Sequence, residues 1–201
     1  TTSAVTANAV GIAAMNADDW HAAGDKGGGV KVAVIDGGFV GYDDLLGTDL
    51  PGTVTVKNFV DFETDAQVDG TTEHSTACAE IVHDIAPDAE MFLGKISTNL
   101  DLQQAVNWAI DQGVDIISTS MGWYNLTPGD GTGEFEELAQ DAEDAGILWV
   151  TAASNDRENH WGGLFNDPEN TSYHYYSTKA NINGFGPDID NLYLLGAGIE
   201  M

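Results

Sequence analysis

The stretch from Val30 to Asp36, "VKVAVID", is the clearest fold signal in the sequence. It is a short β-branched run in which Lys31 is the one polar residue before Asp36. A continuous apolar run of this length is typical of a strand buried on both faces of a parallel sheet. We therefore expect a strand that ends at Asp36, followed by a glycine-rich loop beginning at Gly37 and Gly38.

Similar runs recur along the chain and alternate with amphipathic segments. Strand patterns occupy residues 54–62, 89–96, 114–122 and 147–155, and helical patterns occupy residues 16–24, 74–85, 100–113 and 133–146. Alternation of this kind predicts right-handed crossovers and an α/β fold, with a parallel sheet covered by helices on both faces. For the helix headed by His74, the apolar face is predicted to comprise Ala77, Cys78, Ile81, Val82 and Ile85.

The composition excludes several function classes. The 201 residues include 6 Lys and Arg against 33 Asp and Glu, giving a formal net charge of −27. So acidic a chain is not expected to bind nucleic acid or anionic lipid. Its 42% hydrophobic content is enough for a folded core, but no apolar run has the length of a membrane span. The single cysteine, Cys78, rules out an internal disulfide framework.

Three polar residues are placed where a parallel sheet collects its functional groups, beyond the carboxyl ends of its strands. Asp36 ends the first strand, His74 begins a helix and Asn155 ends the last clear strand. An acid, an imidazole and an amide are parts of a nucleophilic acyl-transfer site.

The motifs around these residues resemble those of the subtilisin-like serine peptidases, the subtilases. "VAVIDGG" (Val32 to Gly38), "HSTACAEIVHDIAPDAE" (from His74), "ISTSMG" (from Ile117) and "VTAASN" (from Val150) occur in the family's order, over about residues 16–161. The resemblance implies a three-layer subtilisin-like fold. It also implies that Asp36 orients the imidazole of His74, that His74 is the general base, and that Asn155 donates to the oxyanion. Ser120, Met121 and Gly122 would line the substrate cleft.

The sequence also departs from the family pattern. Ser75 and Ser154 stand where the family has glycine, and no Gly-Thr-Ser segment, which would carry the nucleophile, occurs in the 201 residues. The chain is therefore expected to be a fragment of a secreted serine endopeptidase, inactive alone, which associates with a missing carboxy-terminal part. The alternative is a catalytically silent extracellular module that binds or assembles with copies of itself. We expect residues 1–160 to form the subtilase-like domain and residues 161–201 to begin a β-rich insertion.

Metal sites are weaker predictions. No cofactor is required, but the family often binds calcium in surface loops, and Asp61, Glu63, Asp65 and Asp69 offer carboxylates in one loop. The Glu80–His83 pair has the spacing of half a di-iron site. Without a second such pair, His83 is expected on a solvated helix face. Cys78 is expected as buried packing.

Overall fold

The computed structural model describes residues 8–123, 131–153, 173–175 and 182–184. The chain divides into two compact units. The first comprises residues 1–121 and 138–152, and the second comprises residues 122–137 and 153–201. The prediction of a domain boundary at residue 160 stays a prediction.

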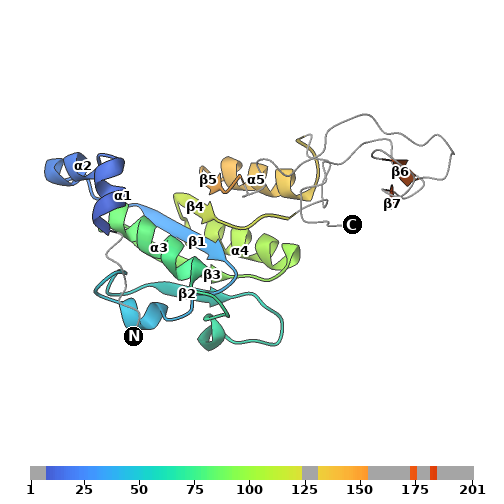
Figure 1. The fold of residues 1–201 in the computed structure, drawn as a ribbon, viewed down its shortest axis with the longest axis horizontal. Helices are drawn as coiled ribbons and strands as arrows, with labels where there is room; N and C mark the ends of the chain where they lie inside the picture. The colour runs from blue at the N-terminus through green and yellow to red at the C-terminus, as the bar shows by residue number, and fades with distance from the viewer. Residues whose placement is uncertain (1–7, 124–130, 154–172, 176–181, 185–201) are drawn as a thin grey trace. The chain divides into compact units, whose positions relative to one another are not determined.

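A five-stranded parallel sheet forms the centre of the first unit (Figure 1). Its strands are β1 (Lys31–Asp36), β2 (Thr55–Asn58), β3 (Glu90–Lys95), β4 (Ile116–Thr119) and β5 (Leu148–Thr151). The spatial order is β2-β3-β1-β4-β5, and all the neighbouring pairs are parallel. The predicted α/β class and parallel sheet are therefore confirmed.

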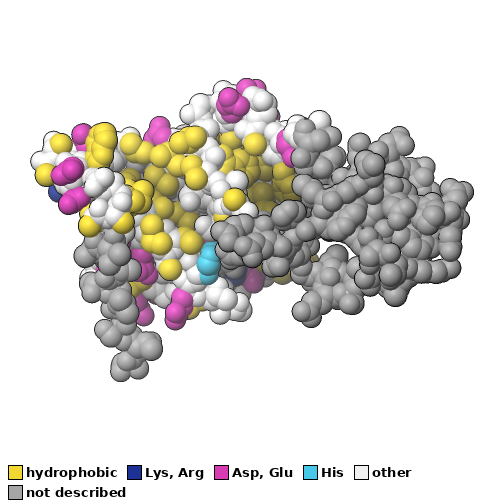
Figure 2. All heavy atoms as spheres, turned by 45° about the horizontal axis from the view of Figure 1, so that its top comes forward, with side chains coloured by type: hydrophobic (Ala, Val, Ile, Leu, Met, Phe, Trp, Pro, Cys, Tyr) yellow, Lys and Arg dark blue, Asp and Glu magenta, His cyan; other side chains and the backbone are white. Residues whose placement is uncertain are grey.

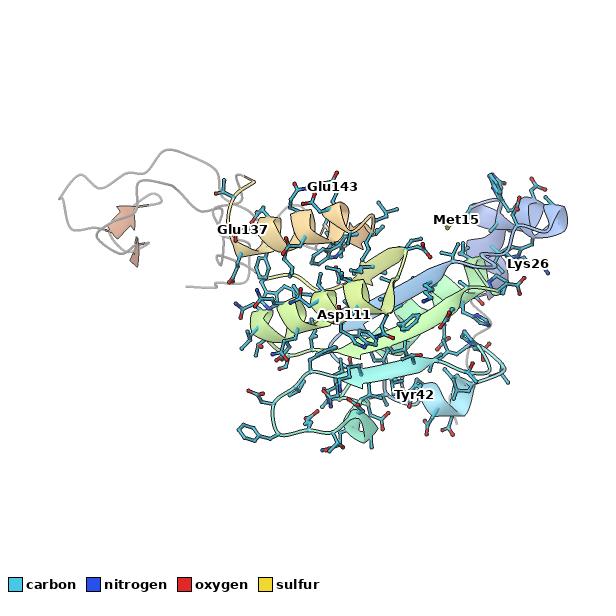
Figure 3. The ribbon with its side chains drawn as sticks, turned by 180° about the vertical axis from the view of Figure 1, so that it is seen from behind. Met15, Lys26, Tyr42, Asp111, Glu137 and Glu143 are labelled. Carbon is cyan, nitrogen blue, oxygen red and sulfur yellow. The ribbon has the colours of Figure 1, made fainter. Side chains whose placement is uncertain are left out.

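Helices cover both faces of this sheet, which gives three layers. Helix α3 (His74–Ile85) lies on the face turned to the viewer in Figure 1, and α4 (Asn99–Gln112) lies on the face turned to the viewer in Figure 3. The other helices are α1 (Asn8–Ala14), α2 (Ala17–Ala23) and α5 (Glu134–Asp144), with 3₁₀ helices η1 (Tyr42–Leu45) and η2 (Asp65–Gln67) in the loops. Charged residues such as Asp111 on α4 and Glu143 on α5 are exposed (Figure 3).

Alternation along the strands divides the core between the two faces. Val34, Met91 and Leu93 belong to a buried cluster with Ala79 of α3. The neighbouring positions turn to the opposite face, where Phe92 meets Trp108 of α4 with ring centroids 5.8 Å apart. Because successive side chains of a strand point to opposite faces, one apolar run supplies both halves of the core. This is why β1 and β3 read as uninterrupted apolar sequence.

The predicted face of α3 is right in part, since Cys78 and Val82 pack against the core cluster as predicted. The buried residues of this helix are Ser75, Thr76 and Ala79, whereas Ala77 is exposed and Ile81 is 59% exposed. The fully buried side chains of α3 are therefore small ones, beside the partly buried Cys78 and Val82. Thr76 satisfies its hydroxyl by donating to the carbonyl of Val40 at 2.9 Å. Hydropathy alone could not place these polar residues inside.

Asn16 occupies the N-cap position of α2 but does not cap the helix with its side chain. Its backbone is left-handed, with φ 54° and ψ 30°, and its side chain makes no capping hydrogen bond. Asparagine tolerates this conformation better than most residues. Asn16 therefore turns the chain between α1 and α2, and Gly24, also left-handed, ends α2 as expected.

The second unit is described over short segments. Its strands β6 (Tyr173–Tyr175) and β7 (Ile182–Gly184) form an antiparallel pair, so β structure is present in the region where it was predicted. In the same unit the rings of Trp123 and Phe135 lie 5.5 Å apart.

Candidate active site

Asp36 is a buried carboxylate at the carboxyl end of β1. The residue is 3% exposed, and its Oδ1 accepts a hydrogen bond of 2.7 Å from the backbone N–H of Gly37. Its Oδ2 is buried and accepts no hydrogen bond. One oxygen is thus fixed by the backbone, and the other is left for a neighbouring group.

That neighbour is His74, the first residue of α3. Its Nδ1 lies 3.3 Å from Asp36 Oδ2, and its side chain is 55% exposed while that of Asp36 is 5% exposed. The imidazole therefore has one nitrogen beside a buried carboxylate, on a ring that solvent reaches. A proton on Nδ1 is favoured by the carboxylate, which leaves Nε2 free to accept a proton from a third group.

The loop between β1 and η1 holds the two residues in place. The N–H of Phe39 donates to the carbonyl of Val68 at 3.0 Å, and the Thr76 hydroxyl ties the first turn of α3 to Val40. At Gly38, φ is +132°, and a Cβ would lie 1.9 Å from the carbonyl oxygen of Asp69. Glycine is thus required where this loop meets the segment leading to α3.

Cys78 lies beside the same imidazole. It is half-buried, one helical turn after His74, and its Sγ is 3.9 Å from His74 Nε2. The expectation that Cys78 is simply packed in the core is therefore incomplete. The i,i+4 spacing was the signal that could have identified the contact.

For the other predicted site residues within the described ranges, the structure shows the burial and the place in the fold but no contact with Asp36 or His74. Ser120 and Met121 directly follow β4 and are half-buried, whereas Gly122 is exposed and belongs to the second unit. Asn155 lies outside the described residues. Ser75 is 1% exposed, so its side chain packs inside the protein beneath the start of α3.

Two of the four carboxylates predicted to bind calcium, Glu63 and Asp65, already have partners in the structure, and the calcium site stays a prediction. Glu63 Oε2 accepts from Lys95 Nζ at 2.6 Å and from Asn58 Nδ2 at 2.8 Å. Asp65 accepts from Lys57 Nζ at 3.1 Å and from the N–H of Asn58 at 3.0 Å. These bonds from Asn58 and the lysines lower the pKa of both carboxyls. Lysine ammonium groups thus supply the positive charge that calcium would bring.

His83 is a second titratable group on α3, and the expectation of a solvated position is wrong. The residue is half-buried, and its Nδ1 is buried without a hydrogen-bond partner. Burial lowers its pKa, against the opposing effect of Asp84, Asp49 and Asp88. Burial also raises the pKa values of Glu80 and Asp84. The α-helical phase places this cluster away from the Asp36–His74 pair.

Of the helices in the described ranges, none combines the length and apolar character that crossing a membrane demands.

Comparison with known proteins gives a consistent picture. A sequence model of the subtilase family matches residues 27–184. The chain is 30% identical over 165 residues to the major intracellular serine protease of Bacillus subtilis, covering 73% of this chain and 49% of that protein. It is 28% identical over 156 residues to subtilisin DY of Bacillus licheniformis, covering 72% and 54%. The chain thus spans about half the length of these relatives.

Solved structures show the same fold. A lanthipeptide protease superimposes with a TM-score of 0.57 at 23% identity, covering 74% of this chain and 47% of that one. The prenylagaramide maturation protease PagA gives a TM-score of 0.51 at 18% identity, covering 70% and 51%. At these identities the match concerns the fold alone.

Proposed function

Because the chain belongs to the subtilase family, we propose that it supplies the acid, the base and part of the substrate cleft of a subtilisin-like serine endopeptidase. The observation that carries the proposal is the 3.3 Å approach of the exposed His74 imidazole to the buried Asp36 carboxylate. This geometry suits proton transfer at Nε2 with the ring held by Asp36. The substrate is a peptide or protein chain.

The proposed mechanism assigns a proton-handling role to each residue. His74 Nε2 accepts the proton of a serine hydroxyl as the oxygen attacks the peptide carbonyl, and later returns it to the leaving amine. Asp36 stabilises the imidazolium and holds the tautomer through Nδ1. The Asn155 amide donates to the oxyanion, and the segment Ser120–Met121 after β4 binds the extended substrate backbone as an added strand.

The serine is proposed to come from sequence beyond these residues, since no Gly-Thr-Ser segment is present in them. The 201-residue chain alone is therefore expected to hydrolyse no peptide. Association with the half that carries the serine would complete the site. We further propose that the enzyme acts outside the cell, where its acidic surface keeps it soluble in salt.

The test is to express the complete reading frame that contains this chain and to measure hydrolysis of a chromogenic peptide. The His74→Ala variant should have a kcat about 10⁶-fold lower, the size of effect that loss of the histidine has in proteases of this kind. Asn155→Ala should lower kcat by about 100- to 1000-fold, as loss of an oxyanion donor does. The matched control is His21→Gln, since His21 Nε2 contacts the carbonyl of Ile85 and not the site.

Absence of turnover in the complete protein, with no serine labelled by a fluorophosphonate probe, would overturn the proposal. It would favour the catalytically silent binding module.

A further inference from the structure

A lysine ammonium group lies inside the protein at the carboxyl end of β3. Lys95 is 9% exposed, and its Nζ donates to Glu63 Oε2 at 2.6 Å and to the carbonyl oxygen of Gln67 at 2.8 Å. Taking a charge out of water costs free energy, and apolar side chains in place of a buried ion pair are often as stabilising or more so. Stability is therefore a weak reason for a lysine here, and the two atoms that it holds point to another role.

Asn58 holds the same two acceptor atoms from the neighbouring strand. It is 7% exposed and pairs with Lys95 in the register of β2 and β3. Its Nδ2 donates to Glu63 Oε2 at 2.8 Å and to the carbonyl oxygens of Thr64 and Gln67 at 3.1 Å. The Gln67 carbonyl thus accepts from two buried side chains, one on each strand, and this fixes the end of η2 against the sheet.

The segment after η2 is bound to the loop that follows β1. The carbonyl of Val68 accepts from the N–H of Phe39 at 3.0 Å, and both side chains are buried in one cluster with residues of α3. The carbonyl oxygen of Asp69 lies 1.9 Å from the place that a Cβ on Gly38 would take. Contacts that fix the end of η2 therefore also restrain the loop that leaves Asp36.

The same loop holds the start of α3. In the first turn of this helix, the Thr76 hydroxyl donates to the carbonyl of Val40 at 2.9 Å. On the strand side, Asp36 pairs with Lys95 in the register of β1 and β3. Strands β2, β3 and β1 lie side by side in this order (Figure 1), so their carboxyl ends connect Lys95 to both members of the Asp36–His74 pair.

We propose that Lys95 is a positioning residue for the Asp36–His74 pair, and that it acts through the Gln67 carbonyl and the segment 67–69. This role rests on the proposed function, because it matters only if the pair transfers a proton. Without the ammonium group, the end of η2 loses one of its two side-chain donors and the loop after β1 gains freedom. The 3.3 Å approach of the imidazole to the carboxylate is then held in fewer molecules. A misplacement of about 1 Å can cost about 100-fold in rate.

The first experiment measures the loop itself, by native-state hydrogen exchange of the 201-residue chain in NMR. In Lys95→Met, the amide of Phe39 should exchange about 10-fold faster or more, because its hydrogen bond to Val68 opens more often. The reference is the amide of Asp115, which donates to the carbonyl of Lys31 at 2.9 Å at the amino ends of β4 and β1 and should change by no more than about 2-fold. Equal acceleration of both amides would show a loss of global stability alone and overturn the proposal, as would unchanged exchange at Phe39.

Lys57→Met is the matched control. Lys57 pairs with Asp65 of η2 at 3.1 Å, but the two side chains are 42% and 48% exposed. The variant removes the same charge from the same part of the chain without removing a buried donor, so exchange at Phe39 should stay within about 2-fold. An effect as large as that of Lys95→Met would show that charge, and not the contact with Gln67, restrains the loop, and the proposal would be wrong.

A second variant separates positioning from the cost of an unpaired charge. Lys95→Met alone leaves Glu63 without its cation, which can lower stability or prevent folding. The double variant Lys95→Met/Glu63→Met replaces both charges by apolar side chains and should stay folded by circular dichroism and urea denaturation. The Gln67 carbonyl still lacks its ammonium donor, so exchange at Phe39 should stay fast. Return of slow exchange would show that the lysine only balances charge, which contradicts the proposal.

Kinetics of the complete protein give a readout that lost stability would not move. At a temperature where the double variant is folded, its kcat should be about 10- to 100-fold lower with KM within about 3-fold, because proton transfer and not substrate contact is impaired. Lys57→Met should keep its kcat. In an active protein, an unchanged kcat in the double variant would refute the positioning role and leave the proposed function intact. An inactive complete protein would contradict the proposed function, whereas the exchange data would still decide whether Lys95 fixes the loop.

Discussion

At Gly38 the backbone adopts a conformation that residues with side chains rarely adopt. A second chain segment also occupies the space that a Cβ atom would need. With φ at +132° and a Cβ position 1.9 Å from the Asp69 carbonyl oxygen, Gly38→Ala must move one of the two loops. We expect this change to lower the free energy of unfolding by about 2–4 kcal/mol in urea denaturation.

The adjacent glycine is the matched control. A Cβ on Gly37 meets no heavy atom within 4 Å, and its φ lies outside the positive range. Gly37→Ala should therefore change the stability by no more than about 0.5 kcal/mol. Equal losses in the two variants would contradict the role given to the Gly38–Asp69 approach.

His83 should make the stability of the chain depend on pH. Burial lowers the pKa of the folded state below the ordinary value of 6.5, so the unfolded chain takes up the proton first as the pH falls. The contribution of His83 is present above pH 6.5 and is lost as the pH falls toward the lowered folded value. His83→Gln should therefore show a smaller loss of stability between pH 7 and 5, measured by urea denaturation.

Neighbouring carboxyls act in the opposite direction. The raised pKa values of Glu80 and Asp84 give stability that is present at low pH and is lost as the pH rises through their folded values. Both groups remain in His83→Gln, so the difference between the two proteins isolates the histidine. If the free energy of unfolding depended on pH in the same way in the unaltered chain and in His83→Gln, the burial of His83 would be contradicted.

At the scale of one element, α4 begins with a capping box that can be tested alone. The Thr98 side chain accepts from the N–H of Asp101, and Asp101 Oδ2 accepts from the N–H groups of Ser97 and Thr98 at 2.9 Å. Thr98→Ala removes one half of this exchange and should cost about 1 kcal/mol, with a corresponding fall in Tm. The control is Thr72→Ala at an exposed loop position. A Tm equal to that of the control would show that α4 does not depend on its cap.

Elements whose sequence pattern is local were predictable, whereas pairings set by the sheet register were not. The apolar runs of the sequence predict strands β1 and β3. The predicted end of the first strand places Asp36, and the predicted start of the helix places His74. The carboxylates of its own loop suggest that Glu63 is a calcium ligand, because a loop pattern carries no information about distant partners. Its partner Lys95 is 32 residues away and is brought there by the register that pairs Asn58 with Lys95.

The two faces of α3 show the same limit. Hydropathy favours Ile81 for the core, but the fully buried residues of α3 are Ser75, Thr76 and Ala79, with Cys78 and Val82 partly buried beside them. Which face of a helix is buried depends on the space above the sheet, and that space is a property of the assembled layers. The i,i+4 spacing of His74 and Cys78 indicates that their side chains are neighbours, but it does not give the distance between them.

At the scale of the whole molecule, charge is the dominant property. The net charge is −27, with 33 acidic and 6 basic residues, and acidic side chains are scattered around a hydrophobic band on the face drawn in Figure 2. Mutual repulsion of like charges destabilises the compact state, and salt screens it over about 10 Å at 0.1 M. We therefore expect Tm to rise by roughly 5 °C or more between 0.1 M and 1 M NaCl.

The nature of the cation separates screening from specific binding. If screening is the cause, tetramethylammonium chloride should raise Tm as much as NaCl, and CaCl₂ and MgCl₂ should act alike at equal ionic strength. The lysine contacts of Glu63 and Asp65 are the physical reason to expect no separate calcium effect, because those carboxylates are already neutralised. A Tm rise at low CaCl₂ that MgCl₂ does not reproduce, and that Asp65→Asn abolishes, would show instead that calcium displaces the lysines and holds this loop.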